Sequence, residues 1–141
     1  MYKLKDYLQQ LQNKKVIYGS YRQIGAQLNM TFQNAHYLIT GRKMGTFETY
    51  AELDRLFGCE FTFVDYAKGV SEALTNSELS DKFVAEYVGI TEIHVKSIRE
   101  CKGVCYRQNY ERLEDLLDGK LDDRIITGIK KPRKVKNENS R

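Results

Sequence analysis

Few residues in this 141-residue sequence interrupt helices or signal special chemistry. It contains one proline, no tryptophan, two histidines and three cysteines. Because proline interrupts helices, its scarcity favours a mainly helical fold. No apolar run approaches the roughly 20 residues that a membrane-spanning helix needs, and no basic segment followed by an apolar signal core stands at the amino terminus. We therefore expect a cytoplasmic protein with no membrane partner.

The cysteines and histidines form no recognisable catalytic or metal-binding motif. Cys59, Cys101 and Cys105 are odd in number and include no CxxC pair, which fits free thiols in a reducing compartment. Cys101 and Cys105 together with His94 fall short of the four ligands of a closed zinc site. No glycine-rich loop of the kinds that bind nucleotides is present. The sequence therefore predicts a protein that is not an enzyme and that uses no metal or other cofactor.

Charge is unevenly distributed, although the total is only +4. Residues 1–59 contain eight basic and four acidic side chains, whereas residues 81–119 contain six basic and eight acidic ones. The last twelve residues, 130–141, hold six basic side chains and one acidic one, and their lack of apolar periodicity predicts a disordered basic tail. If nucleic acid is the partner, the first segment and the tail are expected to provide most of the phosphate contacts.

Four helices are predicted before residue 59. Apolar residues at i, i+3, i+4 and i+7 predict the first over residues 3–13. Ser20 and Gln23 form an S-x-x-Q capping box that starts a short second helix. This helix is expected to end at Asn29, which tolerates the left-handed backbone conformation of a tight turn.

The third and fourth helices follow the same logic. Thr31 can cap a helix of sequence FQNAHYLIT, and Thr46 can cap another that ends at Gly58. A helical projection of the third helix places Ala35, Leu38 and Ile39 inward and Gln33, Asn34, His36 and Tyr37 outward.

A short strand is expected after each set of helices. In residues 59–66, CEFTFVDY, apolar and polar residues alternate and β-branched or aromatic types dominate. The segment DDRIITGIK, residues 122–130, has a similar character, and residues 66–79 can hold a weak helix between the two sets. The strands near 60–66 and 124–130 can pair with each other or form a homodimer.

A shift of 60 residues aligns residues 20–59 with residues 80–119. Only five of the 40 aligned pairs are identical. The positions that agree in physical role are helix caps, turn residues and inward residues, whereas the outward residues differ, as expected for one fold used twice. We therefore predict a tandem repeat.

Residues 20–58 resemble the lambda-repressor-like, or Cro and XRE, helix-turn-helix family. That family places a small residue midway along its scaffold helix, where Gly25 and Ala85 stand in the two copies. The family's turn glycine is present as Gly89 and replaced by Asn29, and Tyr21 replaces a glutamine that usually touches phosphate. The strand after the first copy looks like that of antitoxin-type members.

The resemblance implies a mainly α fold of two tandem lambda-repressor-like helix-turn-helix units with a short β-strand after each. The predicted boundaries are 1–66 for the first unit, 67–129 for the second and 130–141 for the tail.

In the first unit, the resemblance implies that the third helix enters the major groove of DNA. Asn34 or Gln33 can then form a bidentate pair with adenine, and Phe32 can contact a thymine methyl group. Basic residues beside the helix can contact phosphates. The DNA-binding residues predicted here are Tyr21, Arg22, Thr31, Phe32, Gln33, Asn34, His36, Tyr37, Arg42 and Lys43.

The second unit has a weaker electrostatic case for DNA binding. Its outward face can contact bases and phosphates, but its net negative charge also fits a solvated face or a protein-interaction surface. The candidate DNA-binding residues there are Thr91, Glu92, His94, Lys96, Ser97, Arg99 and Lys102.

Together these features predict a sequence-specific, double-stranded DNA-binding transcriptional regulator of the repressor type, from a bacterial or phage operon. Two alternatives stay open. One is an antitoxin-like autoregulator that binds both DNA and a toxin. The other is a protein-interaction module that uses the same fold to bind another protein.

Overall fold

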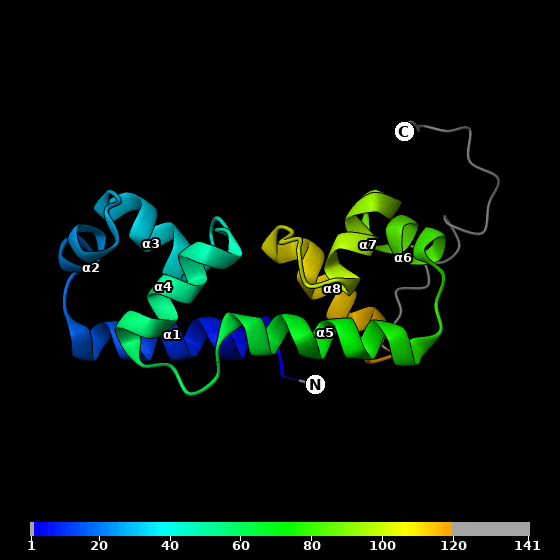
Figure 1. Ribbon diagram of the computed structural model, residues 1–141, viewed down its shortest axis with the longest axis horizontal. Coiled ribbons are helices and arrows are strands. Elements are labelled where there is room, and N and C mark those ends of the chain that lie inside the picture. The colour runs from blue at the N-terminus through cyan, green and yellow to red at the C-terminus, as the bar shows by residue number, and fades with distance from the viewer. Residues whose placement is uncertain (1, 120–141) are drawn as a thin grey trace.

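The structure, a computed structural model, describes residues 2–119 and shows eight helices within them (Figure 1). The helices are α1 Leu4–Tyr18, α2 Tyr21–Leu28, α3 Phe32–Thr40, α4 Phe47–Phe57, α5 Phe63–Ser77, α6 Asp81–Val88, α7 Glu92–Arg99 and α8 Arg107–Leu117. The mainly helical prediction is confirmed. None of these described helices is both long and apolar enough to span a membrane. The tail and the strand expected near 124–130 lie outside the described residues.

The helices repeat in order and in length. α1 and α5 have 15 residues each, α2 and α6 have eight, α3 and α7 have nine and eight, and α4 and α8 have 11. We call α1–α4 the first half and α5–α8 the second half. The boundary predicted between residues 66 and 67 falls within α5.

Local signals place the ends of α2, α3 and α4 correctly. Ser20 and Gln23 form the expected capping box, and Asn29 adopts the left-handed conformation with φ of 58°. The third and fourth helices begin after Thr31 and Thr46, as predicted, and each threonine hydroxyl accepts a backbone hydrogen bond. The first helix is longer than predicted and continues to Tyr18.

The strand predicted over residues 60–66 is wrong. Thr62 and Asp65 form a capping box that starts α5 at Phe63, so helix geometry applies from there on. The residues before Thr62 form a loop that is tied to α1, because the Gln10 side-chain amide donates to the Phe61 carbonyl at 2.7 Å. The apolar alternation seen in the sequence arises because Phe61 packs from this loop while Phe63 belongs to the helix. The homodimer that this strand could have formed therefore has no strand in residues 60–66 through which to form.

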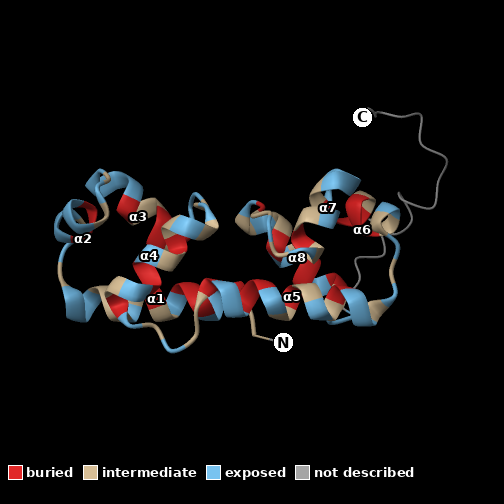
Figure 2. Ribbon diagram, in the orientation of Figure 1, coloured by how far each residue is buried: buried red, intermediate tan, exposed pale blue. Residues whose placement is uncertain are grey.

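The two halves meet along a shared layer. In Figure 1, α1 and α5 run outward from the middle in opposite directions, and the α2–α3 and α6–α7 pairs lie on the same side of this layer. Figure 2 shows buried residues concentrated along α1 and α5 and on the adjoining parts of α4 and α8. Phe63 joins the halves, since its ring stacks on Tyr50 with a centroid distance of 4.4 Å and meets the Tyr7 ring edge at 5.6 Å.

Two buried carboxylates link the halves reciprocally. Asp54 of α4 is 5% exposed and accepts from the Tyr7 hydroxyl at 2.5 Å and from the backbone N–H of Phe63, the first residue of α5, at 2.8 Å. Burial raises the pKa of this carboxyl, and the hydrogen bonds from Tyr7 and Phe63 counteract part of that rise. One oxygen of the Asp54 carboxylate therefore accepts from the first half, and the other accepts from the second half.

Glu114 of α8 repeats this arrangement in the opposite direction. It is also 5% exposed, and it accepts from the Tyr66 hydroxyl at 2.5 Å and from the backbone N–H of Leu4, the first residue of α1, at 2.7 Å. The first turns of α1 and α5 therefore lie together at the centre of the molecule. Each half caps the first helix of the other.

Removal of either tyrosine hydroxyl should test this cross-link. We expect Tyr7→Phe and Tyr66→Phe each to lower the free energy of unfolding by about 1.5–3 kcal/mol, because each leaves a buried carboxylate without its hydroxyl donor. Tyr18→Phe is the matched control, since the Tyr18 side chain is partly exposed and should change stability by less than about 0.5 kcal/mol. Urea unfolding curves measure all three. Equal stability of Tyr7→Phe and Tyr18→Phe would contradict the role assigned to the carboxylate.

Candidate nucleic-acid interface

A close contact between α2 and the following turn positions α3. The backbone N–H of Met30 donates to the Gly25 carbonyl at 2.8 Å. A Cβ atom on Gly25 would lie 2.6 Å from the Met30 carbonyl oxygen and 3.2 Å from the Thr31 carbonyl. Glycine therefore permits this approach. The second half has Ala85 at the corresponding position, where it is buried beneath its own turn.

The cap of α3 leaves its first turn open to solvent. Thr31 accepts from the Asn34 backbone N–H at 3.1 Å, and Ala35, Leu38 and Ile39 are buried as predicted. Phe32 is 52% exposed, and the neighbouring Gln33 is exposed as well. Side-chain amides that project from an exposed helix can pair with base edges in a major groove.

Aromatic rings connect α3 to the residues around it. The Gln33 side-chain amide donates to the Tyr37 hydroxyl at 2.7 Å. His36 is half-buried and meets the Tyr21 ring edge at a centroid distance of 4.9 Å. His36 and Tyr37, which were expected to point outward, are thus only partly exposed.

Four cations surround this helix, and each lies over an aromatic ring. The Arg22 guanidinium lies 4.9 Å from the Phe32 ring centroid. Arg42 and Lys43 lie 5.6 and 5.1 Å from the Tyr37 ring, and Lys15 lies 4.4 Å from the Tyr21 ring. We call this set the α3 surface: Lys15, Tyr21, Arg22, Thr31, Phe32, Gln33, Asn34, His36, Tyr37, Arg42 and Lys43. The structure brings all ten residues predicted for the first unit into it, and adds Lys15.

The α3 surface is positively charged without compensation. Residues 7–47 contain five Lys or Arg and no Asp or Glu. Within the described part of the chain, the four cations of this surface form no ion pair with a carboxylate. A cation without a carboxylate partner can neutralise a phosphate without first breaking an ion pair.

The corresponding surface on α7 has a different character. Residues 67–107 contain six basic and six acidic side chains. Thr91 caps the helix through the His94 backbone N–H at 3.1 Å, and Glu92, Ile93 and Lys96 are exposed. The Lys102 ammonium lies 3.7 Å from the Glu100 carboxylate. His94 and Ser97 are half-buried.

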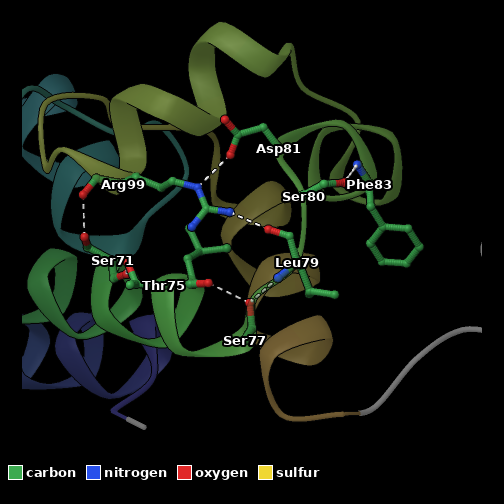
Figure 3. Close-up of polar contacts among 9 residues, drawn as sticks. Ser71, Thr75, Ser77, Leu79, Ser80, Asp81, Phe83 and Arg99 are labelled. Atoms are coloured by element: carbon green, nitrogen blue, oxygen red, sulfur yellow. Dashed lines mark hydrogen bonds and ion pairs between the residues drawn. The ribbon is translucent and has the colours of Figure 1, made fainter.

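Arg99, expected on the outward face, is bound inside the second half (Figure 3). It stands 60 residues after the buried Ile39, so it occupies an inward position of its helix. Its guanidinium donates to Asp81 at 2.6 Å and to the Leu79 carbonyl at 2.7 Å, and its own carbonyl accepts from the Ser71 hydroxyl. These contacts join α7 to α5 and to the start of α6. The Arg99 guanidinium is therefore already bonded within the protein.

Two members of these surfaces escaped sequence reasoning. Lys15 was missed because the first helix was expected to end at residue 13, whereas α1 continues to Tyr18 and carries this side chain to Tyr21. Ile93 was not singled out, although it is 77% exposed and occupies the place on α7 that Gln33 holds on α3. The 60-residue shift was the signal that could have identified it.

The three cysteines form no disulfide within the described residues. Cys59, Cys101 and Cys105 are free. Burial, together with the nearby Asp54 carboxylate, raises the pKa of Cys59 to about 12, and burial raises that of Cys105 to about 12 as well. Both thiols therefore stay protonated at neutral pH. Among residues 2–119, no three His, Cys, Asp or Glu side chains are grouped to hold a metal ion.

Searches of protein-family models, of curated proteins and of solved structures find no match to this chain. The function is therefore inferred from the residues and their geometry.

The close approach at Gly25 predicts unequal effects of two glycine substitutions. We expect Gly25→Ala to destabilise the protein by about 1–3 kcal/mol, because the new methyl group would overlap the turn backbone. Gly69→Ala in α5 should stabilise by about 0.5–1 kcal/mol, because a Cβ there meets nothing within 4 Å and alanine favours the helix. Chemical denaturation measures both. A Gly25→Ala protein as stable as the wild type would contradict the close approach of the turn backbone to residue 25.

Proposed function

We propose that this protein binds double-stranded DNA sequence-specifically through the α3 surface and regulates transcription as a repressor-type protein. The observation that carries this proposal is an exposed helix turn bearing two amide side chains, surrounded by four cations that have no carboxylate partner among residues 2–119. Occupancy of an operator by such a protein would exclude the polymerase.

Base recognition is assigned to the first turn of α3. Gln33 and Asn34 are exposed there and can each pair with the N6 and N7 edge of adenine, while Phe32 can contact a thymine methyl group. The bond from Gln33 to Tyr37 restrains the amide, so less side-chain entropy is lost on binding.

Phosphate contacts are assigned to Lys15, Arg22, Arg42 and Lys43. They flank α3 from the end of α1, from α2 and from the loop after α3, as residues that contact the DNA backbone on both sides of an inserted helix would. Their cation–π contacts hold the charged groups near the helix and leave the N–H donors available to phosphate oxygens.

The turn geometry supports a finer fold proposal, namely that each half contains a lambda-repressor-like helix-turn-helix. In the two halves a small residue, Gly25 or Ala85, lies beneath the turn, and Asn29 or Gly89 adopts the left-handed conformation after the scaffold helix. A partly buried apolar residue follows in both halves and packs on the core.

Selection of sites from random duplexes by the purified full chain, followed by binding isotherms over a salt series, tests the proposal. We expect Asn34→Ala to weaken binding to the selected site by about 1–3 kcal/mol and to relax the preference at the base it contacts. Arg42→Ala and Lys43→Ala should weaken binding to all sequences and each reduce the slope of log K against log salt by about one.

Lys68→Ala is the matched control, because Lys68 is an exposed lysine of α5 outside the α3 surface. It should leave both affinity and salt slope close to those of the wild type. Binding that is insensitive to Asn34→Ala and Arg42→Ala would favour the protein-interaction module. Loss of DNA binding when a neighbouring gene product is added would favour the antitoxin-like autoregulator.

A further inference from the structure

The pairing of α1 with α5 holds the exposed helices α3 and α7 on one side of the molecule. Asp54 and Glu114 each bond the first turn of both helices, so these turns lie together at the centre. From there the two helices run apart, and the α2–α3 and α6–α7 pairs lie on the same side of them (Figure 1). The molecule is thus arranged like a symmetric dimer, although it is one chain.

The length of the layer that α1 and α5 form bounds the spacing between α3 and α7. A helix of 15 residues is about 22 Å long, so the outer ends of α1 and α5 are roughly 40 Å apart. The α2–α3 and α6–α7 pairs follow these outer ends and fold back over the layer. Successive major grooves on one side of a duplex are about 34 Å apart, which lies within this span.

The two exposed faces, however, differ at nearly every outward position. α3 presents Phe32, Gln33 and Asn34, whereas α7 presents Glu92 and Ile93 in the first two of these places. A symmetric dimer presents identical faces and therefore reads an inverted repeat. Two unlike faces fixed at one spacing cannot both fit the two halves of an inverted repeat.

Resting on the proposed function, we infer that one molecule binds a single asymmetric DNA site with two unlike half-sites about one helical turn apart. α3 reads the first half-site through its amides. α7 reads the second through Ile93, which is 77% exposed and packs against thymine methyl groups in the major groove. Lys96, exposed on the same helix, contacts a phosphate. The acidic residues beside α7 make this half-site the weaker of the two.

The first test is the form of the selected site. Sequences enriched from random duplexes by the full chain should show two unlike motifs about ten base pairs apart, and analytical ultracentrifugation should show one chain per duplex. An inverted repeat occupied by two chains would overturn the inference while leaving the proposed function intact. A single short motif with no second element would do the same.

The second test replaces thymine with uracil in the second half-site, which removes only the methyl groups. We expect each critical replacement to weaken wild-type binding roughly fourfold, the effect of one buried methyl-sized group. Ile93→Ala should bind the thymine site more weakly and show no further loss with uracil. Ile17→Ala, which alters an isoleucine that is 84% exposed at the end of α1, is the matched control and should respond to uracil as the wild type does.

Two outcomes of these binding experiments distinguish a failure of the role inferred for α7 from a failure of the proposed function. Equal binding of thymine and uracil sites by the wild type, with Asn34→Ala still damaging, would overturn the role of α7 alone. Failure to enrich any duplex, at low salt and with folding confirmed by circular dichroism, would remove the proposed function together with the inference.

Discussion

The arrangement of this molecule depends on two carboxylates buried between its halves. A buried carboxylate is costly unless donors surround it, and neither half supplies both donors. Asp54 takes a hydroxyl from α1 and a backbone N–H from α5, while Glu114 takes a hydroxyl from α5 and a backbone N–H from α1. The desolvated charge is satisfied only when the halves are docked.

This requirement explains why the halves act as one body. Phe63, the residue whose N–H binds Asp54, also inserts its ring among Tyr7 and Tyr50 of the first half. Polar satisfaction and apolar packing therefore select the same docked arrangement, which is the consistency expected of a well-specified fold. The orientation of α3 relative to α7 follows from it.

The duplicated architecture has diverged in charge. Within the described residues, the four cations around α3 form no ion pair with a carboxylate, whereas in the second half Arg99 bonds Asp81 and the Leu79 carbonyl. Arg99 stands where the first half has the buried Ile39, so an ion pair replaces apolar packing at that point. The second half thus uses one of its cations to hold its helices together.

Local sequence signals were sufficient for α2, α3 and α4, where a side chain acts on its own backbone. Helix ends in the first half are set by Ser20 with Gln23, by the caps Thr31 and Thr46 and by the left-handed Asn29, and the inward residues of α3 followed from helical period. The same period brought the candidate residues of α3 to one surface. These features involve residues a few positions apart, so the sequence displays them directly.

Tertiary structure decided the rest, because the deciding partners are distant in sequence. Residues 59–66 alternate like a strand, yet Phe63 packs against Tyr50 and Tyr7 of the first half, and this segment is a loop and a helix start, in agreement with the local Thr62–Asp65 cap. Nothing in the sequence indicated that Asp54 and Glu114 would be buried, or that Arg99 would turn inward to Asp81. The sequence by itself determined where α2, α3 and α4 begin and which residues of α3 face inward. Only folding, by burying charged groups that need partners from another helix, decided how the two halves dock and which cations stay available.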